Sequence, residues 1–294
     1  MNLTVFILVY PIIWLFSKLP FKIIYFVSDC LYIFAYYIVG YRKKVIFKNL
    51  SIVFPEKTTA EKTEIAKASY HHFVDILMEM LKSFSITEKE INEHYKYSNI
   101  EVLNNLYKDG KSVILVGAHY ANWEWILNIC SFTPYKPIAA YTKINNPYFE
   151  KAMLKSRGKF GVQLRQTSQT ITEIEYNHKN NIQALYGLLS DQSPRLKRTF
   201  YWNEFFGVKV PIHTGSEMLA KKYDMNVVFM NTKKVKRGYY ETSFTLLTND
   251  ARKYKDYDLT DEFLKMVENQ VRNEPNYYFW THKRFKHRDK APKD

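Results

Sequence analysis

The sequence predicts an α/β protein with a mostly parallel central sheet flanked by helices, preceded by an apolar N-terminal helical membrane anchor. In the C-terminal two thirds, short apolar runs alternate with segments of helical period, which is typical of parallel strands joined by helices. The run at 111–117 ends next to His119, as expected of a buried strand that leads into a helix. Two N-terminal runs, 3–16 and 23–41, whose only charged residue is Asp29, predict the anchor.

The first N-terminal run is short for a membrane span of about 20 residues, and the second is nearly long enough but contains Asp29. They indicate either one transmembrane anchor or an apolar helical hairpin within one leaflet, the alternative being a buried helix pair. Neither a basic segment before the first run nor a small-residue cleavage site after it is present, so we do not expect a cleaved signal peptide. Arg42, Lys43 and Lys44 follow, which favours the cytoplasmic side for the next domain.

We divide the chain into an anchor, residues 1–41, and one folded domain, residues 42–294. The domain is predicted to begin with helices over 45–82, interrupted at Phe54-Pro55, with a capping box at Thr58–Glu61. The other expected elements are a weakly helical segment at 87–107, strands at 111–117, 137–142, 162–164, 182–190, 227–230 and 239–247 (the last like an edge strand), and helices at 125–129, 147–157, 170–176, 214–223 and 261–272.

The composition favours an anionic partner. Lys and Arg number 43 against 29 Asp and Glu, so the net charge is +14, and aromatic residues make up 17%. Nucleic acid, an acidic carrier protein or anionic lipid would suit this charge, and aromatic residues beside basic ones favour membrane over nucleic acid. Cys30 and Cys130 have neither disulfide-framework nor zinc-site spacing, so we expect two reduced packing residues.

His119 and Glu124 are the first candidates for catalysis. Five residues on an ideal helix turn through about 500°, which leaves the two side chains about 140° apart. They can meet if His119 lies before the first helical residue, with Asn122 as a helix cap. A carboxylate there would hold one imidazole nitrogen as N–H and leave the other as a base; the alternative is a core histidine at a strand end. Asp191 also follows a predicted strand, and ligand sites in parallel sheets gather at the carboxyl ends of strands.

Six short motifs occur in order along the chain. They are Arg42 with Asn49-Leu50 and Phe54-Pro55, His119-Tyr-Ala-Asn-Trp-Glu124, Arg157-Gly-Lys-Phe-Gly161, Ser190-Asp191-Gln192, Phe205-Phe206-Gly207 with Pro211, and Tyr278-Phe-Trp280-Thr-His282-Lys-Arg284-Phe-Lys286. Together, and over nearly the whole chain, they resemble the motifs of the bacterial lipid A late acyltransferases (lauroyl/myristoyl acyltransferases), in the wider lysophospholipid acyltransferase superfamily. Each motif alone is weak, but six in the right order are difficult to obtain by chance.

The resemblance implies a glycerolipid acyltransferase-like fold, with 42–294 as the acyltransferase domain. It implies that His119 is the general base for an acceptor hydroxyl, and that Glu124 orients the imidazole and stabilises the imidazolium. The donor would be the thioester of an acyl carrier protein, the acceptor a lipid A precursor, and the location the cytoplasmic face of the cell inner membrane. No cofactor, metal or nucleic acid is implied, and the sequence has no GxGxxG, GxxxxGK[ST], GxSxG or HExxH motif.

Five more residues are candidates for substrate binding. Arg157 is expected to bind an acceptor phosphate or the oxyanion, because guanidinium matches phosphate geometry; the alternative is a surface ion pair. Asp191, with its neighbour Gln192, is expected to position the acceptor or hold Arg157, or else to be a helix cap. Asn122 is either a cap or a site residue. Arg284 is expected to face lipid headgroups or an acidic carrier, the alternative being a solvated basic tail.

Three departures from the family's pattern leave the acceptor open. Ala121 replaces a glycine, so the turn should not require a positive φ. Lys283 replaces an arginine and cannot form its bidentate fork, and Arg195-Leu-Lys-Arg198 replaces an expected glycine-rich segment. The acceptor could therefore be another lysolipid, an aminolipid or a pigment alcohol. Two remote alternatives are a basic nucleic-acid-associated protein and a membrane scaffold without catalysis.

Overall fold

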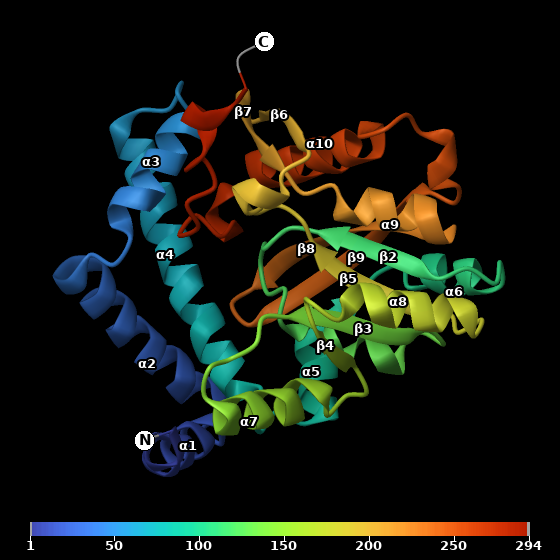
Figure 1. Ribbon diagram of the computed structural model, residues 1–294. Helices are drawn as coiled ribbons and strands as arrows, with labels where there is room; N and C mark the ends of the chain where they lie inside the picture. The colour runs from blue at the N-terminus through green and yellow to red at the C-terminus, as the bar shows by residue number, and fades with distance from the viewer. Residues whose placement is uncertain (1, 293–294) are drawn as a thin grey trace.

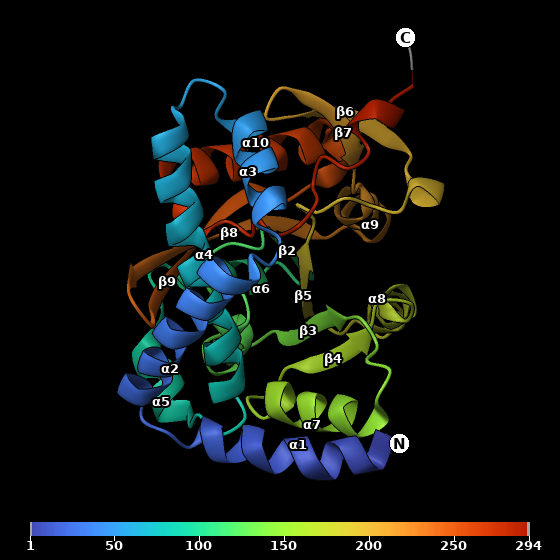
Figure 2. The same cartoon turned by 90° about the vertical axis from the view of Figure 1, so that its left-hand side faces the viewer.

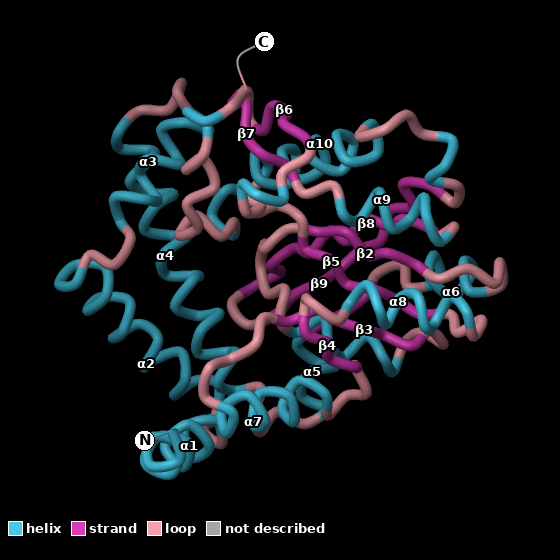
Figure 3. The backbone as a smooth tube through the Cα atoms, in the orientation of Figure 1, coloured by secondary structure: helices cyan, strands magenta, loops and turns pink. Residues whose placement is uncertain are grey.

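The computed structural model describes residues 2–292 and is organised around a seven-stranded sheet, drawn in magenta in Figure 3. Its strands are β1 (Tyr95–Tyr97), β2 (Val113–Gly117), β3 (Lys136–Tyr141), β4 (Gln163–Gln166), β5 (Ala184–Leu189), β8 (Asn226–Lys236) and β9 (Tyr239–Thr248). The spatial order is β1-β9-β8-β2-β5-β3-β4. Every neighbouring pair is parallel except β8 and β9, which form an antiparallel hairpin. The predicted α/β class and the late antiparallel addition are confirmed.

Helices surround this sheet (Figure 1). They are α1 (Asn2–Ser17), α2 (Phe21–Ile33), α3 (Lys43–Val53), α4 (Thr59–Lys82), α5 (Glu88–His94), α6 (Glu101–Tyr107), α7 (Pro147–Gly158), α8 (Thr170–Lys179), α9 (Gly215–Tyr223) and α10 (Asp258–Asn273). A π-helical segment, Phe34–Val39, continues α2, and a 3-10 helix, Trp125–Ser131, follows β2. The capping box predicted at Thr58 and Glu61 opens α4 with both of its reciprocal hydrogen bonds.

Strand β2 lies at the centre of the core and is buried over its whole length. Because side chains alternate between the faces of a sheet, Ile114 and Val116 join the apolar cluster that includes α10, whereas Val113 and Leu115 join the cluster that includes α6. Coverage of both faces explains why the strand is apolar throughout rather than alternating. The carboxyl end of β2 is therefore fixed by packing on two sides.

Three local expectations were incomplete. The segment 87–107 is interrupted by β1, which pairs with β9, so β9 is not an edge strand. A strand of three residues is too short to produce a detectable period. A two-stranded hairpin, β6 (Tyr201–Phe205) and β7 (Val208–Ile212), was not predicted. The chain after His119 also turns through five residues before the 3-10 helix begins at Trp125.

The N-terminal helices lie on the outside of the molecule. Helix α1 runs beside α7 and also contacts α4 (Figure 2), while α2 packs along α4. Among the described residues, one helical segment, Phe21–Val39, is long and apolar enough to cross a membrane; its mean hydropathy is 1.5 and only 17% of it is buried. Large side chains such as Ile12, Phe26 and Ile38 are exposed. The alternative of a buried helix pair is therefore wrong, and the segment could anchor the protein in a membrane.

Candidate active site

His119 and Asp191 are brought together by the register of two neighbouring strands. Strands β2 and β5 are parallel, with Gly117 opposite Leu189. His119 follows Gly117 by two residues and Asp191 follows Leu189 by two, so both leave the sheet at the same edge. Nδ1 of His119 lies 2.7 Å from Oδ1 of Asp191. With Nδ1 donating to this carboxylate, Nε2 is the imidazole nitrogen that can accept a proton.

Asp191 is a buried, ionised carboxylate beside His119. The Asp191 side chain is 1% exposed and that of His119 is 22% exposed. Burial raises the pKa of Asp191, but attraction to His119 and hydrogen bonding outweigh burial and hold that pKa below its usual value. The carboxylate is therefore ionised at neutral pH and can stabilise an imidazolium beside it. The rings of Trp123 and Phe279 flank the imidazole, with centroids 5.4 and 6.0 Å away, and restrict its rotation.

Glu124 has a different partner from the one expected. Its Oε2 lies 2.5 Å from Nη2 of Arg157, on α7, rather than holding the imidazole. The expected orienting contact is therefore corrected, because the carboxylate bound to His119 is Asp191. Local spacing could not identify this pair, since His119 and Asp191 are 72 positions apart. The expectation that Asp191 holds Arg157 is likewise corrected, and the ion pair of Arg157 is with Glu124.

Asn122 is fully buried and both ends of its amide contact the protein. Oδ1 accepts hydrogen bonds from the backbone N–H groups of Glu124 and Trp125 at 3.1 and 3.0 Å, so the residue caps the turn that precedes the 3-10 helix. Nδ2 donates to Oε2 of Glu79 at 2.7 Å. Asn122 thus caps the turn, whereas the N-cap residue of the 3-10 helix itself is Glu124, and a contact of Asn122 with substrate stays a prediction. Gln192 is half-buried next to Asp191.

The C-terminal motif packs against the turn that carries His119. The backbone N–H of Phe279 donates to the carbonyl of His119 at 3.1 Å, and the N–H of Ala121 donates to the carbonyl of Tyr277 at 2.9 Å. The turn after β2 is thus paired with a segment about 160 residues later in the chain. The C-terminal motif was recognisable in the sequence, but its pairing with the turn was not predicted. Backbone hydrogen bonds between distant loops have no local sequence signature.

Two N-terminal motif residues hold the same C-terminal segment. Nδ2 of Asn49 donates to the carbonyls of Trp280 and His282, both at 2.8 Å, and Nη1 of Arg42 donates to the carbonyl of Thr281 at 2.9 Å. Asn49 is buried, so these bonds are made away from water, where an unpaired carbonyl is costly. Motifs from the two ends of the chain therefore form one scaffold behind the site.

Arg284 does not face a headgroup or a carrier protein, and that expectation is wrong. Its side chain is 2% exposed and lies under the β6–β7 hairpin. Nη1 donates to the carbonyl of Pro211 at 3.2 Å and to Oγ of Ser193 at 3.4 Å, and the guanidinium lies 4.9 Å from the ring centroid of Phe205. Arg284 therefore ties the loop that carries Asp191 to the hairpin. Its neighbour Lys283 is exposed.

An apolar cavity of about 520 Å³ extends from His119 into the protein. Its polar lining includes the His119 imidazole and the Glu124–Arg157 ion pair. Most of the remaining lining is aliphatic and comes mainly from the sheet and from the 3-10 helix Trp125–Ser131. These apolar residues include Leu115, Ile138, Val162, Leu164, Ile171, Leu185 and Leu189. A mostly apolar cavity with a small number of polar groups is typical of a site for a small molecule.

Comparison with known proteins decides the family. The family model described as bacterial lipid A biosynthesis acyltransferase matches residues 2–287. This chain belongs to that family. The lipid A biosynthesis palmitoleoyltransferase of Escherichia coli (strain K12) is 20% identical over 94% of this chain and 89% of its own length. The lipid A biosynthesis lauroyltransferase of the same organism is 22% identical over 94% of this chain and 90% of its length, and the lipid A biosynthesis acyltransferase of Shigella flexneri is 20% identical.

Membership of the lipid A acyltransferase family confirms the resemblance seen in the motifs. It places the chain among acyltransferases of lipid A biosynthesis. At this level of identity the roles of individual residues depend on the geometry described above.

The turn of this lipid A acyltransferase family member departs from expectation at Ala121, whose φ is +49°. Ala121 is fully buried, and an L-residue with a side chain in this region is strained by about 1–2 kcal/mol. The substitution Ala121→Gly should therefore be nearly neutral, because relief of strain offsets the more flexible unfolded chain. Ala118→Gly, at a buried alanine without positive φ, should lower the free energy of unfolding by about 1 kcal/mol. Urea unfolding of both variants checks this; an equal loss in both would contradict it.

Acid should destabilise the fold from about pH 6.5 downwards. Burial lowers the pKa of His72, His94 and His213, and lowers that of His282 to about 4. The unfolded chain then binds more protons than the folded one between pH 4 and 6.5, so the free energy of unfolding rises with pH in this window. His282→Gln should flatten this slope by up to one proton, measured by urea unfolding at several pH values. An unchanged slope would contradict the assignment for His282.

Proposed function

We propose that this protein transfers a fatty acyl chain from an acyl carrier protein thioester to a hydroxyl group of a lipid A precursor. Acyl transfer in lipid A biosynthesis follows from the family. The observation that carries the mechanism is the His119–Asp191 pair at the wall of an apolar cavity. The cavity supports an alkyl chain as the bound group, and the imidazole supports removal of a hydroxyl proton next to it.

In the proposed reaction, Nε2 of His119 takes the proton of the acceptor hydroxyl as its oxygen attacks the thioester carbonyl carbon. The ionised Asp191 favours the imidazolium that forms. The tetrahedral intermediate then collapses, the carbon–sulfur bond breaks, and the thiolate of the carrier takes the proton back from His119. One ester and one free thiol result, and His119 returns to its starting state.

Arg157 is the proposed group for the negative charge of the substrates. Glu124 holds one of its terminal nitrogens, and the remaining N–H groups are free to donate to an acceptor phosphate or to the oxygen of the tetrahedral intermediate. Among the described residues, Nη1 has a contact only with the weak acceptor Sδ of Met153, at 3.4 Å. Glu124 would thus act through Arg157, and Gln192 remains a proposed contact of the acceptor.

The N-terminal helices are proposed to bind the cytoplasmic face of the inner membrane. One side of α1 is held against α7 by ring contacts such as Phe6–Phe149, with centroids 5.2 Å apart, while the exposed side is apolar. This arrangement favours α1 lying along the bilayer surface rather than crossing it. Lys44, which is exposed in the basic segment after the π-helical segment, would then face anionic headgroups.

Mass spectrometry of total envelope lipids tests the function. A deletion strain should produce lipid A that lacks one acyl chain, restored by the wild-type gene but not by His119→Ala. The mass difference gives the chain length. Loss of an acyl group from another lipid class would retain the chemistry but overturn lipid A as acceptor. No change in any lipid class would overturn the proposed function.

A further inference from the structure

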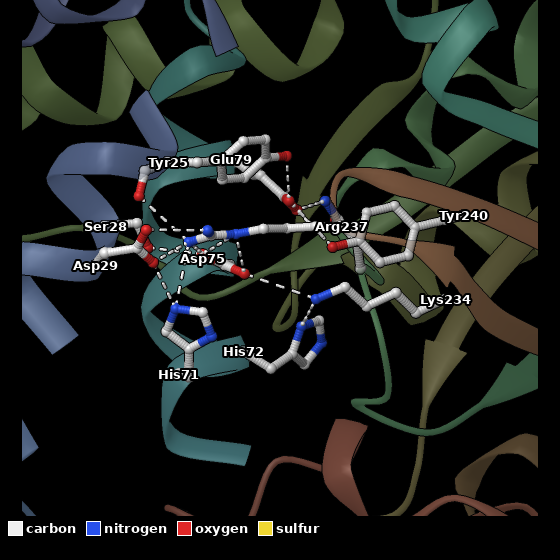
Figure 4. A network of polar contacts seen from close by, with 11 residues as sticks. Tyr25, Ser28, Asp29, His71, His72, Asp75, Glu79, Lys234, Arg237 and Tyr240 are labelled. Atoms are coloured by element: carbon white, nitrogen blue, oxygen red, sulfur yellow. Dashed lines mark hydrogen bonds and ion pairs between the residues drawn. The ribbon is translucent and has the colours of Figure 1, made fainter. Parts of the chain in front are cut away.

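Glu79 is a fully buried carboxyl group in the last turn of α4, and the proposed mechanism assigns it no role. It lies where α4 meets α2 and the β8–β9 hairpin (Figure 4), and it also contacts Asn122 in the turn after β2. Burial and the neighbouring Asp75 raise the pKa of Glu79 to about 7. A buried acid with a perturbed pKa beside a candidate active site requires a structural or functional reason.

The partners of Glu79 fix its orientation. Tyr25, on α2, donates to Oε1 at 2.8 Å, and Tyr240, on β9, donates to Oε2 at 2.9 Å. Gly238, in the β8–β9 turn, allows the first of these bonds, because a Cβ atom at this position would collide with the hydroxyl of Tyr25. The carboxyl group is therefore held from two sides, and Oε2 also faces the turn that carries His119.

The contact toward the site is made through Asn122. Either end of the Asn122 amide could face the turn. The carboxyl group of Glu79 selects one orientation, because it accepts a hydrogen bond from Nδ2 at 2.7 Å. This leaves Oδ1 to accept the N–H groups of Glu124 and Trp125. The orientation of one amide thus fixes the backbone between His119 and the Glu124–Arg157 ion pair.

We infer that Glu79 is a positioning residue for the acyl transfer, acting through Asn122 to hold the turn between His119 and Glu124. The inference rests on the proposed function. It also makes α2 part of the scaffold of the active site, because Tyr25 supplies one of the hydrogen bonds that hold Glu79. A displacement of about 1 Å at a reacting group can cost about 10²-fold in rate, so a loosened turn should be visible in kcat.

The neighbouring half of the network supplies a control. Arg237 binds Asp29 at 2.6 Å and Asp75 at 2.7 Å, and Ser28 donates to Asp75 at 2.7 Å. These bonds join α2, α4 and the hairpin (Figure 4), and none of the three involves Asn122. Asp29→Asn should therefore lower the melting temperature and leave kcat unchanged.

The test is a double-mutant cycle on kcat with the full-length protein and an acyl carrier protein thioester. Asn122→Ser keeps a capping oxygen but loses the donor to Glu79, and Glu79→Met removes the acceptor. Each should lower kcat by between about 10- and 10²-fold, with KM for the thioester little changed, and the double variant should be no slower than the slower single variant. Glu79→Gln keeps an acceptor oxygen and should retain kcat within a few-fold.

Folded Asn122→Ser with wild-type kcat would overturn the inference, even if Glu79→Met fails to fold. Losses in kcat that multiply in the double variant would also overturn it, because the two residues would then act separately. Both results require an active wild type and so leave the proposed function standing. If the wild-type protein transfers no acyl group, the proposed function fails instead. The melting temperatures of the wild type, the two single variants and the double variant then still report whether Glu79 and Asn122 are coupled.

Discussion

Replacing His119 with alanine should lower the rate of acyl transfer by about 10²–10⁴-fold, the usual contribution of a general base. Nε2 of His119 faces no other protein donor or acceptor among the described residues, and its Nδ1 is engaged by Asp191. Among the described residues, no other imidazole is hydrogen-bonded to Asp191; His213 also lines the cavity but lacks this bond. The purified variant is assayed for transfer from an acyl carrier protein thioester to the acceptor lipid.

His119→Asn is the matched variant for stability. An asparagine amide can donate to Asp191 much as Nδ1 does, whereas alanine leaves a buried carboxylate unpaired, which is costly. We expect the asparagine variant to be as inactive as the alanine variant but closer to wild type in melting temperature. Normal turnover in either folded variant would exclude His119 as the base.

The second large effect is expected for Asp191→Asn. The substitution retains size but removes the charge that favours the imidazolium and the Nδ1–H tautomer; in a Ser–His–Asp triad the corresponding change costs about 10⁴ in kcat. We expect a loss of roughly 10³-fold in kcat on the same physical ground. The comparison is with Glu124→Gln, because the Glu124 carboxylate contacts Arg157 instead of the imidazole.

Glu124→Gln should have the smaller effect on kcat and a larger relative effect on KM for the acceptor, because it loosens Arg157 and leaves the base in place. Steady-state kinetics of the two variants, with circular dichroism to verify folding, decide the point. A nearly inactive Glu124→Gln beside an active Asp191→Asn would reverse the roles and restore Glu124 as the residue that acts on His119.

Local sequence patterns predicted much of the scaffold. The apolar run before His119 predicted a buried strand, and β2 is buried on both faces. Thr58 and Glu61 predicted the start of α4, because a capping box satisfies backbone donors within four residues. Strand β1 and the β6–β7 hairpin were missed, since their short strands depend on pairing partners far away in the chain.

Arg284 and Ala121 illustrate a different limit. The composition around Arg284 indicated a solvated or headgroup-facing residue, yet the guanidinium is covered by the hairpin. At Ala121, the absence of glycine argued against a positive φ, yet pairing with Tyr277 holds the backbone there. In both cases contacts with distant segments outweigh the local preference of the residue.

The sequence by itself determined the fold class, the family, and the positions of His119 and Asp191 at the carboxyl ends of two strands, because strand period and motif order are local properties. Only the tertiary structure decided which carboxylate holds His119. That choice depends on β5 lying beside β2 in a register that sets Leu189 opposite Gly117. Strand order is a property of the packed sheet, so the pairing of His119 with Asp191, and of Glu124 with Arg157, exists only in the folded chain.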